Sequence, residues 1–192
     1  ALIDCTREYS FEQFFEECER YARVFSALHM SDSDGSRVGI GSTITAAPIF
    51  AFYGLNMTGA TVSMLSYPDF LPSGQWKEMV EQEKITDLIL SDFIVTPDLI
   101  RDIERNRERL GIKHVIFLHS RLGGPCTGPA EMIFNEFNYH ALKRRPGTVF
   151  MDDLLVKYES YPITYAKEDP DHIAVITTTS GTTKGTRKPL PY

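Results

Sequence analysis

Apolar and polar positions repeat along this chain with two different periods. Between residues 11 and 29, large apolar side chains recur every three or four positions, with acidic residues between them. This spacing is typical of an amphipathic helix. Ser10 and Gln13 have the three-residue spacing of a capping box at its start. The stripe that we expect to face the core consists of Phe11, Phe14, Phe15, Cys18, Tyr21, Ala22, Phe25 and Leu28.

The rest of the chain alternates short apolar runs with helical patterns, separated by turn residues. We predict strands at 37–41, 61–66, 87–91, 114–119 and 172–177, and helices at 44–57, 74–83, 97–110 and 151–158. Several of the strands are continuous apolar runs, which is typical of a parallel sheet that is buried on both faces. The sequence therefore predicts an α/β layered fold, with a mostly parallel sheet and helices on both faces. Residues 120–136, rich in Gly and Pro, are interpreted as a surface excursion.

Residues 38–68 contain no charged residue, so we considered whether they could span a membrane. Gly, Pro, Asn, Ser and Thr interrupt this stretch repeatedly. A spanning helix needs about 20 predominantly apolar residues. A buried strand, helix and strand explain the stretch better, so we expect no membrane span. The polar opening also lacks the apolar segment of a secretory signal.

Charge and cysteine content narrow the function classes. The chain has 20 basic and 26 acidic residues, and its basic residues form no stripe. Nucleic acids attract clustered Lys and Arg, so we expect no nucleic-acid partner. The chain has three cysteines, Cys5, Cys18 and Cys126. This is an odd number, and no two of them have C-x-x-C spacing. This pattern favours a reduced, cytoplasmic protein whose cysteines are packing residues rather than zinc ligands.

A few other residues are candidates for chemistry. His114 and His119 flank a predicted strand, but a catalytic base would need a Ser or Cys partner that the sequence does not place. The pair at 152–153, both Asp, opens a predicted helix, where acidic groups suit the helix dipole. Trp76 is interpreted as a packing residue rather than a stacking platform.

The most unusual segment follows the last predicted strand. Residues 177–188 contain six Thr, one Ser, two Gly and three basic residues. Backbone amides at glycines, hydroxyls and cationic side chains suit a polyphosphate. A solvated Ser/Thr-rich loop has the same composition, so composition leaves both readings open. The Walker A pattern fails because Gly181 and Gly185 are too close together and Thr186 follows Gly185. The dinucleotide fingerprint G-x-G-x-x-G also fails.

The segment resembles the signature of the adenylate-forming superfamily, which reads S/T-S-G-S/T-T-G-x-P-K-G. Residues 179–183 match its first five positions. If Lys184 is an insertion, Gly185 and Lys188 supply the family Gly and Lys, which is the register we favour. In the unbroken register, Lys184 replaces that Gly and Arg187 replaces that Lys. The earlier segments 9–14, 37–42 and 49–62 are also similar to family segments, in the same order.

The resemblance implies an ATP-dependent, carboxylate-activating ligase of the acyl-CoA synthetase type. Residues 1–192 would be the N-terminal part of its AMP-binding domain, truncated just after the phosphate-binding loop and inactive alone, with catalytic residues expected downstream. The expected ATP phosphate-binding residues are Thr179, Ser180, Gly181, Thr182, Thr183, Gly185 and Lys188. Thr182 or Thr183 would approach Mg²⁺. The expected partners are ATP, a carboxylic acid, with a medium or long fatty acid preferred, and coenzyme A or another thiol.

Two rival functions remain from the sequence. One is a non-catalytic α/β domain that binds a phosphate or nucleotide. The other is a P-loop kinase or NTPase, which the glycine spacing and the segment Pro189–Pro191 disfavour, because a helix should follow a P-loop.

Overall fold

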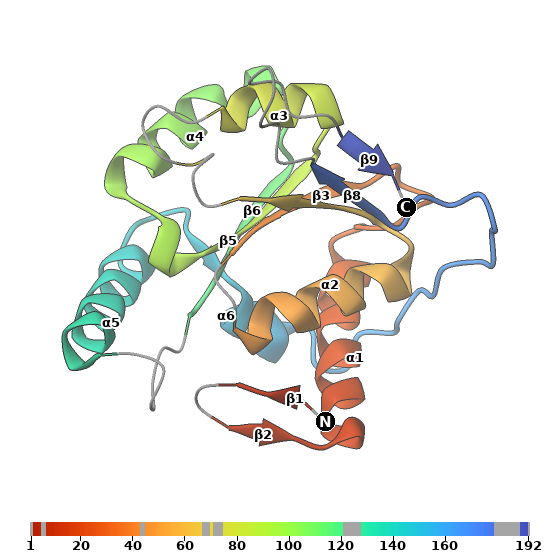
Figure 1. The fold of residues 1–192 in the computed structure, drawn as a ribbon, viewed down its shortest axis with the longest axis horizontal. Coiled ribbons are helices and arrows are strands. Elements are labelled where there is room, and N and C mark those ends of the chain that lie inside the picture. The colour runs from red at the N-terminus through yellow and green to blue at the C-terminus, as the bar shows by residue number, and fades with distance from the viewer. Residues whose placement is uncertain are drawn as a thin grey trace.

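The computed structural model of the chain describes residues 2–4, 7–42, 45–66, 70, 75–120, 128–178 and 189–191 (Figure 1). Its helices are α1 (Phe11–Ala27), α2 (Ala46–Thr58), α3 (Trp76–Glu83), α4 (Pro97–Leu110), α5 (Pro129–Lys143) and α6 (Met151–Lys157), with a 3₁₀ turn η2 (Asp92–Ile94). Its strands are β1 (Leu2–Ile3), β2 (Glu8–Tyr9), β3 (Arg37–Gly41), β4 (Thr61–Leu65), β5 (Asp87–Ser91), β6 (His114–Leu118), β7 (Val149–Phe150), β8 (Val175–Thr178) and β9 (Pro189–Pro191).

Seven of these strands form one sheet, in the order β7-β6-β5-β3-β4-β8-β9. Neighbours from β7 to β8 run parallel, and β9 runs antiparallel to β8. The N-terminal strands β1 and β2 form a separate antiparallel pair. The predicted fold class, a mostly parallel sheet with helices, is therefore confirmed.

Helices cover both faces of the sheet, with a separate apolar core on each. One core contains α1, α2 and α6, and the other contains α3, α4 and the C-terminal part of α5. Figure 1 shows α3 and α4 above the sheet and α1, α2 and α6 below it. Strand β5 alternates between the two cores, since Ile89 belongs to the first and Leu88 and Leu90 to the second. This explains why the strand is apolar throughout.

Local sequence signals set several helix ends. Ser10 and Gln13 form the predicted capping box of α1. Thr96 caps α4 through a hydrogen bond from the Leu99 amide, and Gly111 ends this helix in the left-handed conformation. Gly59, with a φ of 78°, ends α2 in the same way. These ends agree with the sequence because capping depends on a few adjacent residues.

Three sequence predictions are wrong in part. Phe11 and Phe15 were expected in the core, but they are 72% and 56% exposed, because at this end of α1 the contact with α2 is made by Phe14, whose ring meets Phe50 and Tyr53. Residues 120–136 were interpreted as a surface excursion, but Pro129 begins helix α5. The last parallel strand begins at Val175 rather than at residue 172.

The uncharged stretch 38–68 contains β3, α2 and β4, as predicted. Gly54 of α2 lies so close to α1 that an added Cβ would be 3.0 Å from the Ala22 nitrogen and the Cys18 carbonyl oxygen. None of the helices in the described part of the chain has the length and apolar character that crossing a bilayer requires.

Candidate functional site

The carboxyl ends of three neighbouring strands define the candidate site. Strands β3, β4 and β8 run parallel and side by side, so the segments that follow them leave from the same edge of the sheet. Ligands of open α/β sheets bind outside the carboxyl ends of the strands, where the connections diverge to opposite faces. Here β3 leads to α2 on one face and β4 leads to α3 on the other.

All the predicted phosphate-binding residues lie outside the described residues. These are Thr179, Ser180, Gly181, Thr182, Thr183, Gly185 and Lys188, together with the alternatives Lys184 and Arg187. The strands at both ends of this ten-residue segment are described. Thr178 ends β8, Pro189 begins β9, and the two residues are partners in the antiparallel register. The segment therefore starts and finishes on neighbouring strands, and a strand rather than a helix follows it, which argues against the P-loop NTPase reading.

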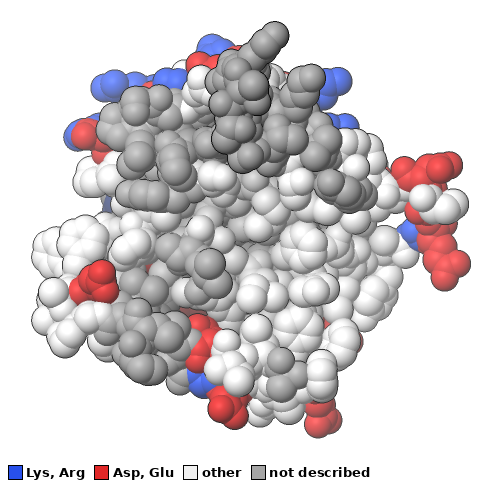
Figure 2. Space-filling view, in the orientation of Figure 1, with Lys and Arg blue, Asp and Glu red and all other residues white. Residues whose placement is uncertain are grey.

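An uncharged groove of about 520 Å³ lies beside the carboxyl ends of β3 and β4. Its lining comes from α2, the carboxyl ends of β3 and β4 and the first residue of β8, and consists of Ser42, Thr45, Pro48, Ile49, Phe52, Met64, Leu65 and Val175. Uncharged residues fill the middle of the face in Figure 2, where Figure 1 places α2 below the sheet. An apolar groove next to polar strand ends suits a ligand with an apolar body and a reactive polar end.

Gly41 shapes the end of β3 beside this groove. An added Cβ at Gly41 would lie 2.5 Å from a ring carbon of Phe70 and 3.0 Å from a methyl group of Leu90. Real side chains do not approach so closely, so only glycine lets the Phe70 ring close over the strand. Phe70 itself is 4% exposed.

A second polar cluster lies at the carboxyl ends of β5 and β6. His119 Nδ1 is 2.7 Å from Asp92 Oδ2, and His119 Nε2 is 3.2 Å from Glu136 Oε1 of α5. The Tyr139 ring stacks on the imidazole at 4.0 Å. Asp92 is fully buried and also accepts a hydrogen bond from the Ser120 amide. His119 borders a polar cavity of about 340 Å³ between α1, α2 and α6.

The charge of this cluster follows from its carboxylates. Burial by itself would lower the pKa of His119. The hydrogen bond to Asp92 and the negative charges of Asp92, Glu136 and Asp152 outweigh burial and raise the pKa above its ordinary value of 6.5. Carboxylates contact both ring nitrogens, so the described contacts give His119 no Ser or Cys to activate. His114 is likewise paired with a carboxylate, since its Nδ1 is 2.7 Å from Asp87 Oδ1.

The remaining candidates are structural. The acidic pair lies in the first turn of α6, and Asp153 contacts Lys143 at 2.9 Å. Among the described residues, no group of three His, Cys, Asp or Glu lies together in a way that would hold a metal ion. Trp76 is 3% exposed and donates a hydrogen bond to Asp102, so it is a packing residue, as predicted.

The sequence did not reveal the groove. Its signal lies in α2, which is apolar on nearly all sides between Ala46 and Thr58. A helix of this kind must be covered all round. One side faces α1 and the sheet, and Ile49 and Phe52 on another side line the groove.

Comparison with known families identifies the class of protein. The sequence matches the model of a family described as AMP-binding enzyme over residues 1–189. The chain therefore belongs to the AMP-binding enzyme family, and the resemblance to adenylate-forming enzymes is confirmed. No curated protein sequence matches the chain.

Three solved structures show the same fold. A red-emitting luciferase from Phrixothrix hirtus is 17% identical with a TM-score of 0.65, and the match covers 98% of this chain and 40% of the luciferase. A long-chain-fatty-acid-CoA ligase from Archaeoglobus fulgidus is 17% identical with a TM-score of 0.63, over 95% of this chain and 29% of the ligase. The adenylation domain of a carboxylate reductase from Mycobacterium chelonae is 16% identical with a TM-score of 0.67, over 96% of this chain and 27% of the matched chain.

These similarities extend over nearly all of this chain but only part of each relative. The chain spans between 27% and 40% of the three matched chains. At such low identities the structures establish the fold alone.

Proposed function

We propose that residues 1–192 are the N-terminal part of the AMP-binding domain of a cytoplasmic, ATP-dependent, carboxylate-activating ligase. In the first half-reaction, a carboxylate oxygen attacks the α-phosphorus of ATP, which forms an acyl-adenylate and releases pyrophosphate. In the second, the sulfur of coenzyme A or another thiol attacks the acyl carbon and AMP leaves, which gives a thioester. Family membership supports the first half-reaction, and the thiol step is the finer part of the proposal.

One observation carries this proposal. Residues 179–188, which we call the phosphate segment, are rich in Thr, Gly and basic residues. They join Thr178 and Pro189, which are partners on neighbouring strands at the carboxyl edge of the sheet. Fixed, adjacent ends reduce the conformational entropy that such a segment would lose on closing around a ligand. Amides, hydroxyls and a cation arranged around phosphates catalyse by positioning and by stabilising negative charge.

The roles within the segment follow from donor chemistry. The amides and hydroxyls of residues 179–183 and the amide of Gly185 would contact the β- and γ-phosphates of ATP. Lys188 would neutralise their charge in the register that we favour, with Lys184 or Arg187 as alternatives. The hydroxyl of Thr182 or Thr183 would reach Mg²⁺, which prefers oxygen ligands and accompanies substrate phosphates.

The uncharged groove supports an apolar acid as the substrate. Its volume of about 520 Å³ falls in the usual range for small-molecule sites. Val175 lines it, three residues before the end of β8, so an acid whose body lay in the groove would have its carboxylate near the phosphate segment. A medium or long fatty acid is the substrate class that we propose.

Carboxylate-dependent exchange between ATP and pyrophosphate by the full-length parent tests the proposal. We expect exchange with fatty acids and not with amino acids, in the presence of Mg²⁺. Exchange that depends only on aryl or amino acids would retain adenylation and reject the fatty-acid substrate. A folded parent that is silent with all three classes would favour the non-catalytic binding domain.

Variants of the phosphate segment test its role. Lys188→Ala and Gly181→Ala in the parent should each reduce exchange by about 10²-fold or more, because charge stabilisation of this kind is worth several kcal/mol. Lys167→Ala is the matched control, since Lys167 is exposed and lies outside the segment. If Lys188→Ala is active and Arg187→Ala is not, the unbroken register is correct. The 192-residue chain alone should form no acyl-CoA.

A further inference from the structure

A second groove lies at the amino ends of β6 and β7, at the opposite end of the parallel strands from the carboxyl end of β8. Strand β7 pairs with β6 at Ile116 and Phe117. The first two residues of β6, His114 and Val115, therefore have no partner in β7. Beside them is a groove of about 270 Å³ at the edge of the sheet.

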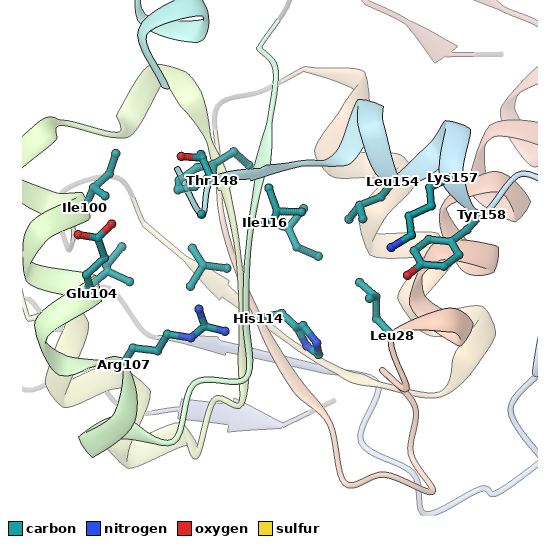
Figure 3. Close-up of a pocket in the computed structure, with 15 residues that line it drawn as sticks. Leu28, Ile100, Glu104, Arg107, His114, Ile116, Thr148, Leu154, Lys157 and Tyr158 are labelled. Carbon is teal, nitrogen blue, oxygen red and sulfur yellow. The ribbon is translucent and has the colours of Figure 1, made fainter. Parts of the chain in front are cut away.

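Apolar side chains line the groove on both sides of this sheet edge. Figure 3 shows Ile100 of α4 on one side and Leu154 of α6 with Leu28 on the other. Val115 of β6 also lines the groove, as does Val149 of β7, which is 39% exposed. At about 30 Å³ per water in the liquid, the groove holds the volume of about nine waters. An apolar body of that size would fill it.

The charged residues that line the groove are mostly committed to protein partners. The guanidinium of Arg107 donates to the carbonyl groups of Ile112 and Lys113. Glu104 forms an ion pair with Arg145 at 2.7 Å. His114 is paired with buried Asp87.

Lys157 is the exception. Its ammonium lies 4.9 Å from the centre of the Tyr158 ring, and the described part of the chain gives it no carboxylate partner. Figure 3 shows the Lys157 and Tyr158 side chains together on the α6 side of the groove. The lining thus contains two cations, Arg107 and Lys157, and one carboxylate, Glu104, in a chain whose acidic residues outnumber its basic ones. This balance favours an anion.

We propose that this sheet-edge groove binds a small amphipathic carboxylate. Its apolar body lies between α4 and α6, and its carboxylate contacts the ammonium of Lys157. The site is independent of the proposed adenylation reaction, because it lies at the opposite ends of the strands and shares no lining residue with the 520 Å³ groove. Octanoate, with ten non-hydrogen atoms, matches the available volume.

Titration of the chain with octanoate, followed by amide chemical shifts, tests the site. We expect the largest shifts at Val115, Val149 and Lys157. Octanol, which lacks the charge, should bind at least about tenfold more weakly, because it cannot form a hydrogen bond between two charged groups. Butyrate, which keeps the charge but has four fewer carbons, should also bind at least about tenfold more weakly, because it buries less apolar surface. Shifts confined to Met64 and Val175, which line the other groove, would overturn the proposal.

Two variants separate the anionic contact from the apolar one. Lys157→Gln should weaken octanoate binding at least about tenfold and leave octanol binding unchanged. Lys167→Gln, at an exposed lysine outside the groove, is the matched control and should change neither. Val149→Trp should abolish binding of both compounds by filling the groove. Because Val149 is partly exposed, the far-ultraviolet circular dichroism should be unchanged.

Three results would contradict parts of this proposal. Octanol that binds as tightly as octanoate, or full octanoate affinity in Lys157→Gln, would reject the carboxylate assignment. Full octanoate affinity in a folded Val149→Trp variant would reject the groove itself. Each of these results would leave the adenylation proposal intact, because that proposal depends on exchange in the parent.

Discussion

Gly54 determines how closely α1 and α2 approach each other. A Cβ added there would lie 2.9 Å from Tyr21 Cβ and 3.0 Å from the Ala22 nitrogen and the Cys18 carbonyl oxygen. Two of these three atoms belong to the backbone of α1, which cannot move aside as a side-chain tip can. The glycine is therefore required by close helix packing, although glycine lowers helix propensity by about 1 kcal/mol relative to alanine.

Gly54→Ala should destabilise the chain by about 1–3 kcal/mol, because overpacking forces backbone shifts that outweigh the gain in helix propensity. Denaturant unfolding followed by circular dichroism measures the change. Gly128→Ala is the matched control, since the nearest atom to its Cβ would be 3.6 Å away. Because Gly128 is the N-cap of α5, where glycine is preferred to alanine, this control should cost no more than about 1 kcal/mol. Equal effects of the two substitutions would contradict the packing argument.

Cys18 lies at the same helix contact and is fully buried. Burial raises the pKa of the Cys18 thiol, and the negative charge of Glu17 raises it further, to about 11. At pH 8 only about one thiol in a thousand would then be a thiolate, and the thiolate is the reactive form. Iodoacetamide at pH 8 should leave Cys18 unmodified in the native chain and modify it in urea, as measured by mass spectrometry of its peptide. Rapid native modification would show that the α1–α2 contact opens readily.

At the scale of elements, α5 differs from the other helices. It buries Asn135 and Leu142 while Ile133, Phe134 and Phe137 are 72%, 59% and 74% exposed. Its middle is held by polar contacts to the segments that follow β5 and β6, among them a hydrogen bond from Asn138 to the Asp92 carbonyl and the contact between Glu136 and His119. Apolar periodicity therefore predicts the wrong face. The usable signal was Pro129 at the first helical position, with Glu131 accepting a hydrogen bond from the Gly128 amide.

The attachment of α5 should depend on pH through His119. Its pKa in the folded chain lies above the ordinary value of 6.5, which applies when the chain is unfolded. The protonated form is thus favoured by folding, and its contribution is complete below about pH 6.5 and is lost as the pH rises through the folded pKa. The groups that face His119 are Asp92 from η2, Glu136 and Tyr139 from α5 and Asp152 from α6.

Amide hydrogen exchange in α5, corrected for intrinsic rates, should accelerate as the pH rises through this range. His119→Gln should remove the dependence and destabilise the chain by about 1–3 kcal/mol at pH 6, because it removes a hydrogen bond from buried Asp92. His29→Gln is the control, since His29 is exposed and lies outside α5 and its contacts with His119. Protection that is constant with pH in the unmodified chain would contradict this linkage.

At the scale of the molecule, the sequence predicted the order of the main elements well and their edges less well. Strand β5 and helix α4 have the predicted bounds, because an apolar run or an amphipathic pattern in each ends at turn or capping residues. Strand β7 has two residues and β9 has three, which is too short to produce a pattern. The motif predicts a phosphate-binding role for residues 179–188, which stays a prediction because they lie outside the described residues. The groove beside the carboxyl ends of β3 and β4 could not be predicted, because side chains from separate strands and α2 form it only in the folded chain.

The sheet order predicts a gradient of local stability across the molecule. Strands β3 and β5 have a neighbour on each side and lie between the two apolar cores, whereas β7 is at one edge and pairs at two positions. Amides on central strands exchange only when much of the domain unfolds, while edge amides exchange through local opening. Hydrogen exchange of the chain should therefore be slowest at Ile40, Ile89 and Leu90 and at least about 10²-fold faster at Val149 and Phe150. Equal protection at the centre and at this edge would mean that the sheet unfolds as one unit. In that case the groove beside β7 would be held as rigidly as the core.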